Sequence, residues 1–227
     1  MSETSTFKLE WDPAGERYYE MGCDRGVLFP MVNSTYPAGV AWNGLISVAK
    51  KPSGAEFTPL YANNRKYVNL QSAENFGCTI EAYTYPEEFE ACNGKKTVVA
   101  GLSVGQQSRS AFGLAYRNFI GNDEEGNKAA YRISLIYGAK ASPAEETDST
   151  INDDPEAKTM SWECETTPVD MAGFEPTSIL EIDSRTVDAE KLLAFEKILY
   201  GSGDADARLP LPDEVAELLG YEGPTAG

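Results

Sequence analysis

The stretch that decides the fold is a pair of strand-like segments around a polar turn: Ser110–Ile120 (SAFGLAYRNFI), Gly121–Asn127 (GNDEEGN) and Ala130–Ala139 (AYRISLIYGA). Apolar residues alternate along both segments and fall on single faces: Phe112, Leu114 and Tyr116 in the first, and Tyr131, Ile133, Leu135 and Tyr137 in the second. Period-two alternation is typical of half-buried strands, and Gly, Asn and Asp favour tight turns. The sequence therefore predicts an antiparallel hairpin. Its acidic turn lacks the ligand spacing of a calcium loop, so we expect a solvated turn.

The same pattern extends from Tyr18 to about Asp183. Further strands are expected at Val40–Ala49, Phe57–Tyr61, Tyr67–Gln71, Phe76–Tyr85, Ala157–Thr167 and Ser178–Asp183. Two of them have a clear buried face, consisting of Phe76, Cys78, Ile80 and Ala82 in one and of Met160, Trp162 and Cys164 in the other. The intervening residues are polar or aromatic, so the opposite face is wet or contacts a partner.

Only two or three helices are expected. Pro86–Cys92 begins with Pro and acids and stops at Asn93-Gly94. The stronger helix runs from about Asp188, a suitable N-cap, to Tyr200, and Gly201 can end it in a left-handed conformation. Its apolar face should cover a sheet through Leu192, Phe195 and Leu199. A short third helix can begin at Pro212.

These elements predict a mainly β protein, a β-sandwich or barrel with one flanking α-helix and extended terminal arms. We expect one domain at 18–200, an N-terminal arm at 1–17 and a C-terminal arm at 201–227. No repeat or linker divides the chain. Its 227 residues are enough for one sound core.

The charge of the chain excludes several functions. It has 36 Asp and Glu against 19 Lys and Arg, a formal charge of −17, and no histidine. Such a chain repels nucleic acid and acidic lipid, which disfavours binding to either. The lack of histidine excludes Ser-His-Asp and Cys-His nucleophile systems and histidine-containing metal sites. The first residues carry no leader pattern, and no apolar run reaches bilayer length, so we expect a soluble protein that is made in a cytoplasm.

Candidate chemistry is sparse. The four cysteines, Cys23, Cys78, Cys92 and Cys164, are scattered and are expected to be reduced thiols, mostly in the core. Asn93–Thr97 lacks the first glycine of a phosphate-binding loop. Glu163 and Glu165 lie about 7 Å apart by strand rise and could flank a glycosidic bond, but a solvated strand face is favoured. We predict no catalytic, cofactor-binding or metal-ligating residues and no cofactor.

Several segments, taken in order, resemble the major tail tube proteins of long-tailed bacteriophages over nearly the whole chain. They are Tyr18–Pro30, Gly39–Leu45, Pro52–Glu56, Pro59–Ala62, Ile80–Phe89, Ile136–Ala139, Asn152–Glu156, Trp162–Pro168 and Ala207–Asp213. The resemblance of each segment on its own is weak, but the order of the segments and their coverage of the chain make the match specific. The match is to the non-contractile type of tail.

The resemblance implies a structural virion protein whose hexameric rings stack into the tail tube. The implied partners are other copies of the chain, the tail tip, tape measure and tail terminator proteins, and double-stranded DNA that passes through without specific binding. It implies synthesis in the host bacterial cytoplasm, location in the virion tail, no membrane partner and no enzymatic activity. An acidic channel wall would let DNA slide. Glu163 and Glu165 are candidates for that wall.

Contacts between rings are expected at the terminal arms and at the loops Ala49–Phe57 and Met31–Gly39. The basic pairs Lys50-Lys51, Arg65-Lys66 and Lys95-Lys96 fall where strand ends or turns are expected, and can meet acidic faces of other copies. Two alternatives stay open: a monomeric β-sandwich that acts as a binding or decoration module, and a carboxylate-dependent glycan hydrolase.

Overall fold

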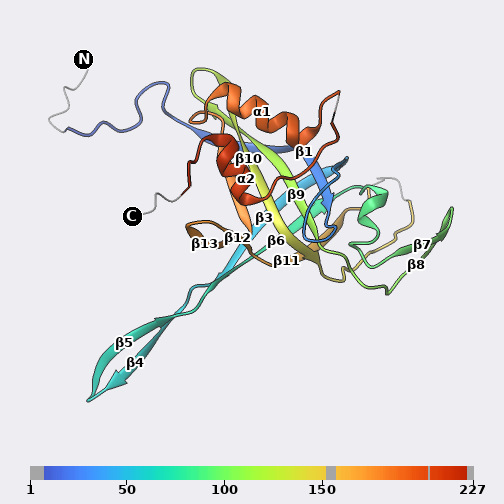
Figure 1. Cartoon of the computed structure of the whole chain (residues 1–227), viewed down its shortest axis with the longest axis horizontal. Helices are drawn as coiled ribbons and strands as arrows, with labels where there is room; N and C mark the ends of the chain where they lie inside the picture. The colour runs from blue at the N-terminus through green and yellow to red at the C-terminus, as the bar shows by residue number, and fades with distance from the viewer. Residues whose placement is uncertain (1–7, 152–156, 204, 224–227) are drawn as a thin grey trace.

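The computed structural model describes residues 8–151, 157–203 and 205–223, and in these the chain is mainly β (Figure 1). Every pairing between named strands is antiparallel, which agrees with the predicted fold class. The elements are β1 (Tyr19–Pro30), β2 (Val40–Ala41), β3 (Leu45–Gly54), β4 (Phe57–Ala62), β5 (Arg65–Gln71), β6 (Glu74–Ala82), η1 (Glu87–Phe89), β7 (Lys96–Val99), β8 (Leu102–Val104), β9 (Phe112–Asn122), β10 (Gly126–Ala141), β11 (Met160–Thr166), β12 (Val169–Met171), β13 (Phe174–Thr177), β14 (Ile179–Asp183), α1 (Ala189–Tyr200) and α2 (Pro212–Leu219).

The main sheet has the order β2–β1–β9–β10–β11–β6–β3, and β14 also pairs with β10. One edge of β10 pairs with β9, while the other pairs with β14 from Arg132 to Ile136 and with β11 from Ala139 to Ala141. Gly138 lies at this change of partner with a φ of 61°, and a Cβ there would meet the Thr167 carbonyl oxygen at 2.3 Å. Glycine is therefore required at the point where the central strand passes from one partner to the next.

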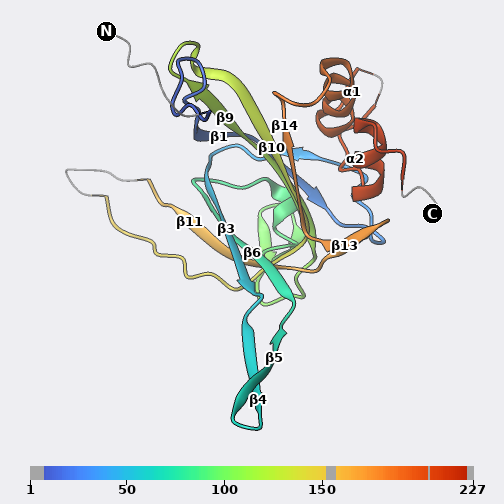
Figure 2. The same cartoon turned by 90° about the vertical axis from the view of Figure 1, so that its left-hand side faces the viewer.

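The sheet folds over itself and separates two apolar cores. The first core lies between the β3–β6–β11 end and the β1–β9–β10 end, and includes Trp42, Ile80, Phe89, Leu114 and Trp162. The second lies on the opposite face of β9 and β10, beneath the helices (Figure 2). Aromatic rings fill the first core and meet mostly edge to face, as for Phe89 and Trp162, whose ring centroids are 5.1 Å apart at an interplanar angle of 74°.

The predicted faces are confirmed in part. Cys78, Ile80 and Ala82 lie together with Trp162 and Cys164 in the first core, as the alternation indicated. In the β9–β10 hairpin each apolar set does share one face, but the two sets lie on opposite sides of the sheet. The register places Leu114 opposite Ile136 and not Leu135, so the β9 set faces the first core and Ile133, Leu135 and Tyr137 face the second.

The helix α1 follows the sequence closely. The Asp188 carboxylate accepts hydrogen bonds from the backbone N–H groups of Glu190 and Lys191, both at 3.1 Å. Leu192, Phe195 and Leu199 are the buried residues of the helix, as predicted. Gly201 ends the helix with a φ of 81° and a ψ of 164°, a positive-φ conformation that favours glycine. Its ψ lies outside the left-handed helical region, so the expected left-handed cap is not formed. The chain turns there into the bridge between Ser202 and Ala205.

The segment after Gly201, expected as an arm, packs on the body as far as α2. Leu209 and Val215 are buried in the second core, and Tyr36 pairs with Leu209 in an isolated bridge. Pro212 occupies the first turn of α2, and Gly220 ends the helix in the left-handed conformation. The region 86–92 forms only the 3₁₀ turn η1, in which the Phe89 side chain is buried, and not the helix expected there.

Some strand boundaries differ from the expected ones. Val40–Ala49 is not continuous: β2 and β3 are separated at Gly44, whose φ of 76° and close approach to Thr84 mark a turn. The strands β1, β7, β8, β12 and β13 are not among those that the sequence pattern predicts. β1 contains two register shifts and residues with positive φ at Gly22 and Arg25, which break the period-two pattern.

Candidate assembly surfaces

The most prominent surface feature is the β4–β5 hairpin, which projects from the body as a continuation of β3 and β6 (Figures 1 and 2). Gly54 and Ala55, with φ values of 83° and 54°, form a neck where β3 gives way to β4. Asn63 and Asn64 form the two-residue turn, and both have positive φ, as a type I′ turn requires. The sequence thus encodes both the neck and the tip of the hairpin.

The hairpin is apolar on both faces although it lies in solvent. Leu60 stands opposite Val68, and Thr58 opposite Leu70, so three aliphatic side chains share one face. Phe57 lies on the other face, and Tyr61 and Tyr67 are 70% and 77% exposed. An isolated two-stranded hairpin is at best marginally stable in water. This hairpin is therefore a surface that a partner would stabilise.

A second apolar hairpin, β7–β8, projects from another part of the body (Figure 1). Val98, Val99, Leu102 and Val104 are all exposed on it. The Glu90 carboxylate holds its base by accepting hydrogen bonds from the hydroxyls of Thr97 and Ser103, at 2.8 and 3.1 Å. This hairpin is not predicted from the sequence, because its exposed valines leave no alternation of apolar and polar residues.

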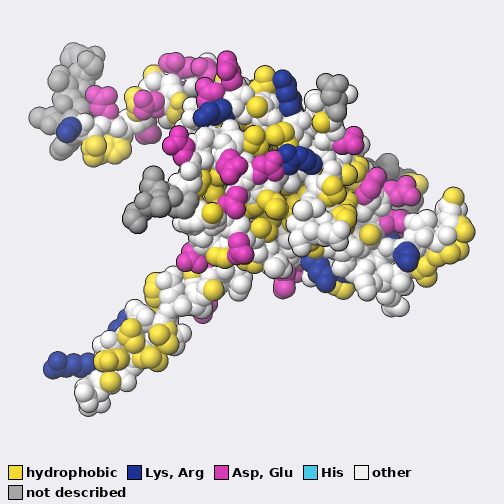
Figure 3. All heavy atoms as spheres, in the orientation of Figure 1, with side chains coloured by type: hydrophobic (Ala, Val, Ile, Leu, Met, Phe, Trp, Pro, Cys, Tyr) yellow, Lys and Arg dark blue, Asp and Glu magenta, His cyan; other side chains and the backbone are white. Residues whose placement is uncertain are grey.

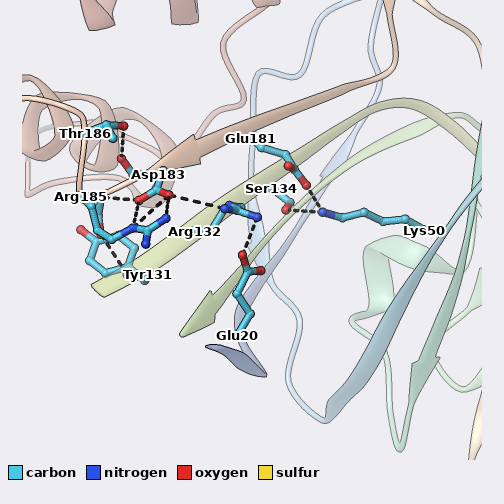
Figure 4. Close-up of polar contacts among 10 residues, drawn as sticks. Glu20, Lys50, Tyr131, Arg132, Ser134, Glu181, Asp183, Arg185 and Thr186 are labelled. Atoms are coloured by element: carbon cyan, nitrogen blue, oxygen red, sulfur yellow. Dashed lines mark hydrogen bonds and ion pairs between the residues drawn. The ribbon is translucent and has the colours of Figure 1, made fainter. Parts of the chain in front are cut away.

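The basic pair Lys50-Lys51 lies in the middle of β3 and not at a strand end, because β3 extends to Gly54. Lys50 donates to the Ser134 hydroxyl at 3.2 Å and pairs with Glu181 on β14 (Figure 4). Lys51 pairs with Glu163 at 2.8 Å. Both lysines therefore form ion pairs between strands of the same chain. The expected loop Ala49–Phe57 is likewise strand and neck.

A network of charges joins β1, β10 and β14 (Figure 4). Arg132 pairs with Glu20 at 2.6 Å and with Asp183 at 3.5 Å, and Arg185 pairs with Asp183 at 2.5 Å. Hydrogen bonds from Arg185, assisted by Arg132, lower the pKa of Asp183 to about 2. The carboxylate stays charged in the folded protein and ties the edge strand β14 to β10.

The candidate carboxylates Glu163 and Glu165 lie on the outer face of β11, across from Thr79 and Gly77 of β6. The Glu163 side chain is 74% exposed, and the hydrogen bond from Lys51 lowers the pKa of Glu163. A glycosidase acid requires the opposite shift, since it must be protonated near neutral pH. Their environment is that of a solvated strand face, which was the favoured interpretation.

The cysteines behave as core residues. Cys78, Cys92 and Cys164 are buried, and all four thiols are free. Burial raises the pKa of Cys23 to about 11 and that of Cys92 to about 12, so both are poor nucleophiles at neutral pH.

Among the described residues, no group of three or more Cys, Asp or Glu side chains is placed to hold a metal ion. In the same part of the chain, no helix is long and apolar enough to cross a membrane.

The described part of the N-terminal segment is tied to the β9–β10 turn. The Gly15 N–H donates to the Asp123 carboxylate at 3.1 Å, and the Asn122 side chain donates to the Gly15 carbonyl at 3.2 Å. Leu9 and Trp11 are largely exposed. Residues 1–7 of the predicted arm, and the resembling segment Asn152–Glu156, lie outside the described residues. The predicted loop at 31–39 is present, but Tyr36 within it is buried.

Comparisons with known proteins return solved structures only. No protein-family model matches the chain. No curated protein sequence matches it either. A chain of the anti-feeding prophage baseplate is similar over 77% of this chain and 97% of its own, with 9% identity and a TM-score of 0.37.

A chain of the sheath–tube complex of an extracellular contractile injection system in the extended state covers 81% of this chain and 99% of its own. It has 10% identity and a TM-score of 0.35. A chain of the sheath/tube terminator of that system covers 77% and 99%, with 8% identity and a TM-score of 0.34. At these values the similarities assign neither function nor type of tail.

Proposed function

We propose that this chain is a structural subunit of a bacteriophage tail tube of the non-contractile type, which assembles into stacked hexameric rings around a channel for the genome. The observation that carries the proposal is the placement of exposed apolar side chains. They concentrate on the projecting hairpins β4–β5 and β7–β8, whereas the body buries its cores well. Exposed apolar surface of this kind marks contact with other proteins.

The positions of the resembling segments support the proposal. Tyr18–Pro30 lies on β1, Ile80–Phe89 runs from β6 to η1, and Trp162–Pro168 covers most of β11 and the two residues after it. These segments contribute to the fold and do not converge on one site. A shared scaffold accounts for such a distribution better than a shared catalytic centre does.

Open strand edges also favour assembly. Over the described residues, β3 pairs only with β6, and β14 pairs only with β10. Unpaired edges are a hazard for a monomer, and a ring of subunits can cover them. In a hexamer, six chains of −17 would surround the channel with −102 formal charges, which would repel DNA and keep it mobile.

As a tail component, the subunit would be made in the host cytoplasm, reside in the virion and contact the tip, tape measure and terminator proteins. Purified protein examined by size exclusion and negative-stain electron microscopy should form rings or hollow tubes, if necessary after addition of an initiating tip complex. Averaged end views should show sixfold symmetry. A protein that stays monomeric at high concentration and with the initiator would overturn the proposal.

A further inference from the structure

We propose that the β4–β5 hairpin is a docking arm for a second copy of this chain, and that its basic tip seats against an acidic hollow beside α2 of that copy. The inference rests on the proposed assembly and names the contact that would drive it. It combines the apolar faces of the hairpin, the charge at its tip and the chemistry of one hollow on the body.

The tip differs in charge from the rest of the chain. Residues 57–71 contain Arg65 and Lys66 and no acidic residue. The chain's −17 includes these two positive charges, so the remainder carries −19. Neither Arg65 nor Lys66 takes part in an ion pair within the described structure, whereas Arg117, Arg132 and Arg185 all do. The tip of the hairpin thus carries basic side chains, whereas acidic side chains are frequent on the body (Figure 3).

The acidic hollow lies between α2 and the β12–β13 hairpin. Its described lining consists of Ala172, Asp213, Glu217, Tyr221, Glu222 and Gly223. Three of these side chains are carboxylates, and none of the lining residues is basic, although the Lys191 amine lies next to Gly220. The Asp213 carboxylate already accepts a hydrogen bond from the Ala172 N–H at 2.8 Å, so the exposed Glu217 and Glu222 are the carboxylates offered to the tip. Tyr221 packs on Phe174, with ring centroids 5.6 Å apart, which gives the hollow an aromatic wall. An arginine is well suited to such a site because its guanidinium can pair with carboxylates and stack on a ring.

A second hollow beside η1 fits the tip less well. It also contains three glutamates, Glu87, Glu88 and Glu90, but Lys95 and Lys96 line it too. These lysines would repel Arg65 and Lys66. Glu90 is already engaged by Thr97 and Ser103. Charge complementarity therefore selects the hollow beside α2.

The hairpin has to reach another molecule to make this contact. Figures 1 and 2 both show its tip far from α2 of the same chain, with the body between. In a neighbouring copy, the same approach would bring Leu60, Val68 and Leu70 against protein. Burial of these half-exposed side chains would add a hydrophobic contribution to the binding free energy from the charge contact.

The test is a charge swap. The double variant R65E/K66E should need a critical concentration for assembly that is at least about tenfold above that of the unmodified chain. The reason is that its two glutamates would meet the carboxylates of the hollow. Adding E217K/E222K to the same chain should restore assembly. Glu217 and Glu222 are exposed, so the reversal leaves the core intact. The control K128E/K197E makes the same change of net charge at two other exposed lysines and should assemble like the unmodified protein.

A second readout locates the contact directly. Single variants K66C and E222C, mixed during assembly and oxidised mildly, should give a cross-linked dimer, while either variant alone should not. If R65E/K66E folds and assembles like the unmodified chain, or if no cross-link forms within assembled tubes, the docking proposal is wrong and the tube function stands. If the unmodified chain never assembles, the proposed function itself fails.

Discussion

Leu192 and Leu193 provide a direct test of how α1 is seated, because they are adjacent residues of the same type in opposite environments. Leu192 is 6% exposed and packs in the second core, whereas Leu193 is 53% exposed. Truncating a buried leucine to alanine typically removes about 2 to 5 kcal/mol of unfolding free energy through lost burial and the cavity left behind. For L192A we expect about 3 kcal/mol, the lower middle of that range, since the helix lies at the surface and can relax.

In a domain of this size each kcal/mol lowers Tm by roughly 2 to 4 °C, so L192A should melt roughly 6 to 12 °C below the unmodified chain. L193A removes little buried area and gains alanine's helix propensity, so its Tm should be nearly unchanged. The measurement is thermal and urea unfolding of the unassembled subunit, followed by circular dichroism. Equal destabilisation by the two variants would refute the docking of α1 by its Leu192 face.

Three further predictions concern the body. G138A should lower the free energy of unfolding far more than G126A. Both glycines have a positive φ, but only at Gly138 would an added Cβ clash with backbone atoms. Urea unfolding of the two variants measures the difference. D183N should lose stability at pH 7. The lowered pKa of Asp183 gives its full stabilisation above about pH 4 and loses it progressively as the pH falls towards 2, so the two chains should converge over that range. Parallel unfolding at pH 7 and pH 3 tests the sign, since the difference should be smaller at pH 3. R117K should be nearly as destabilising as R117A, since a lysine cannot replace the bidentate contact with Asp24 at 2.8 and 2.6 Å; equal stability of R117K and the unmodified chain would contradict this.

Alternation predicted the strands that have one buried face and one exposed face. Cys78 and Ile80 on β6 and Trp162 on β11 were placed correctly because the two faces of those strands meet different environments. β9 and β10 are harder, since both of their faces are buried. There Leu114 and Leu135 are equally apolar, and the register between the strands decides which core each one enters. A sequence pattern carries the periodicity of each strand but not that register.

The candidate surfaces were less predictable for a related reason. β4 and β5 were found as strands, but nothing local to them says that they extend beyond the body. That depends on β3 and β6 pairing over their whole length up to the neck at Gly54. The pairs of Lys50 and Lys51 with Glu181 and Glu163 depend on residues more than 100 positions away. Such contacts follow from topology, which the sequence of either partner does not contain.

The proposed contact also bears on the kind of assembly that results. The hairpin tip and the hollow beside α2 are different surfaces, so a copy that offers its tip to one neighbour can still receive the tip of another. Such heterologous contacts do not stop at a dimer: they close into rings when the rotation allows, and propagate as helical filaments when it does not. A subunit in which one apolar patch pairs with itself would stop at two copies. The separation of the cationic tip from the anionic hollow on one chain would therefore permit an open-ended stack.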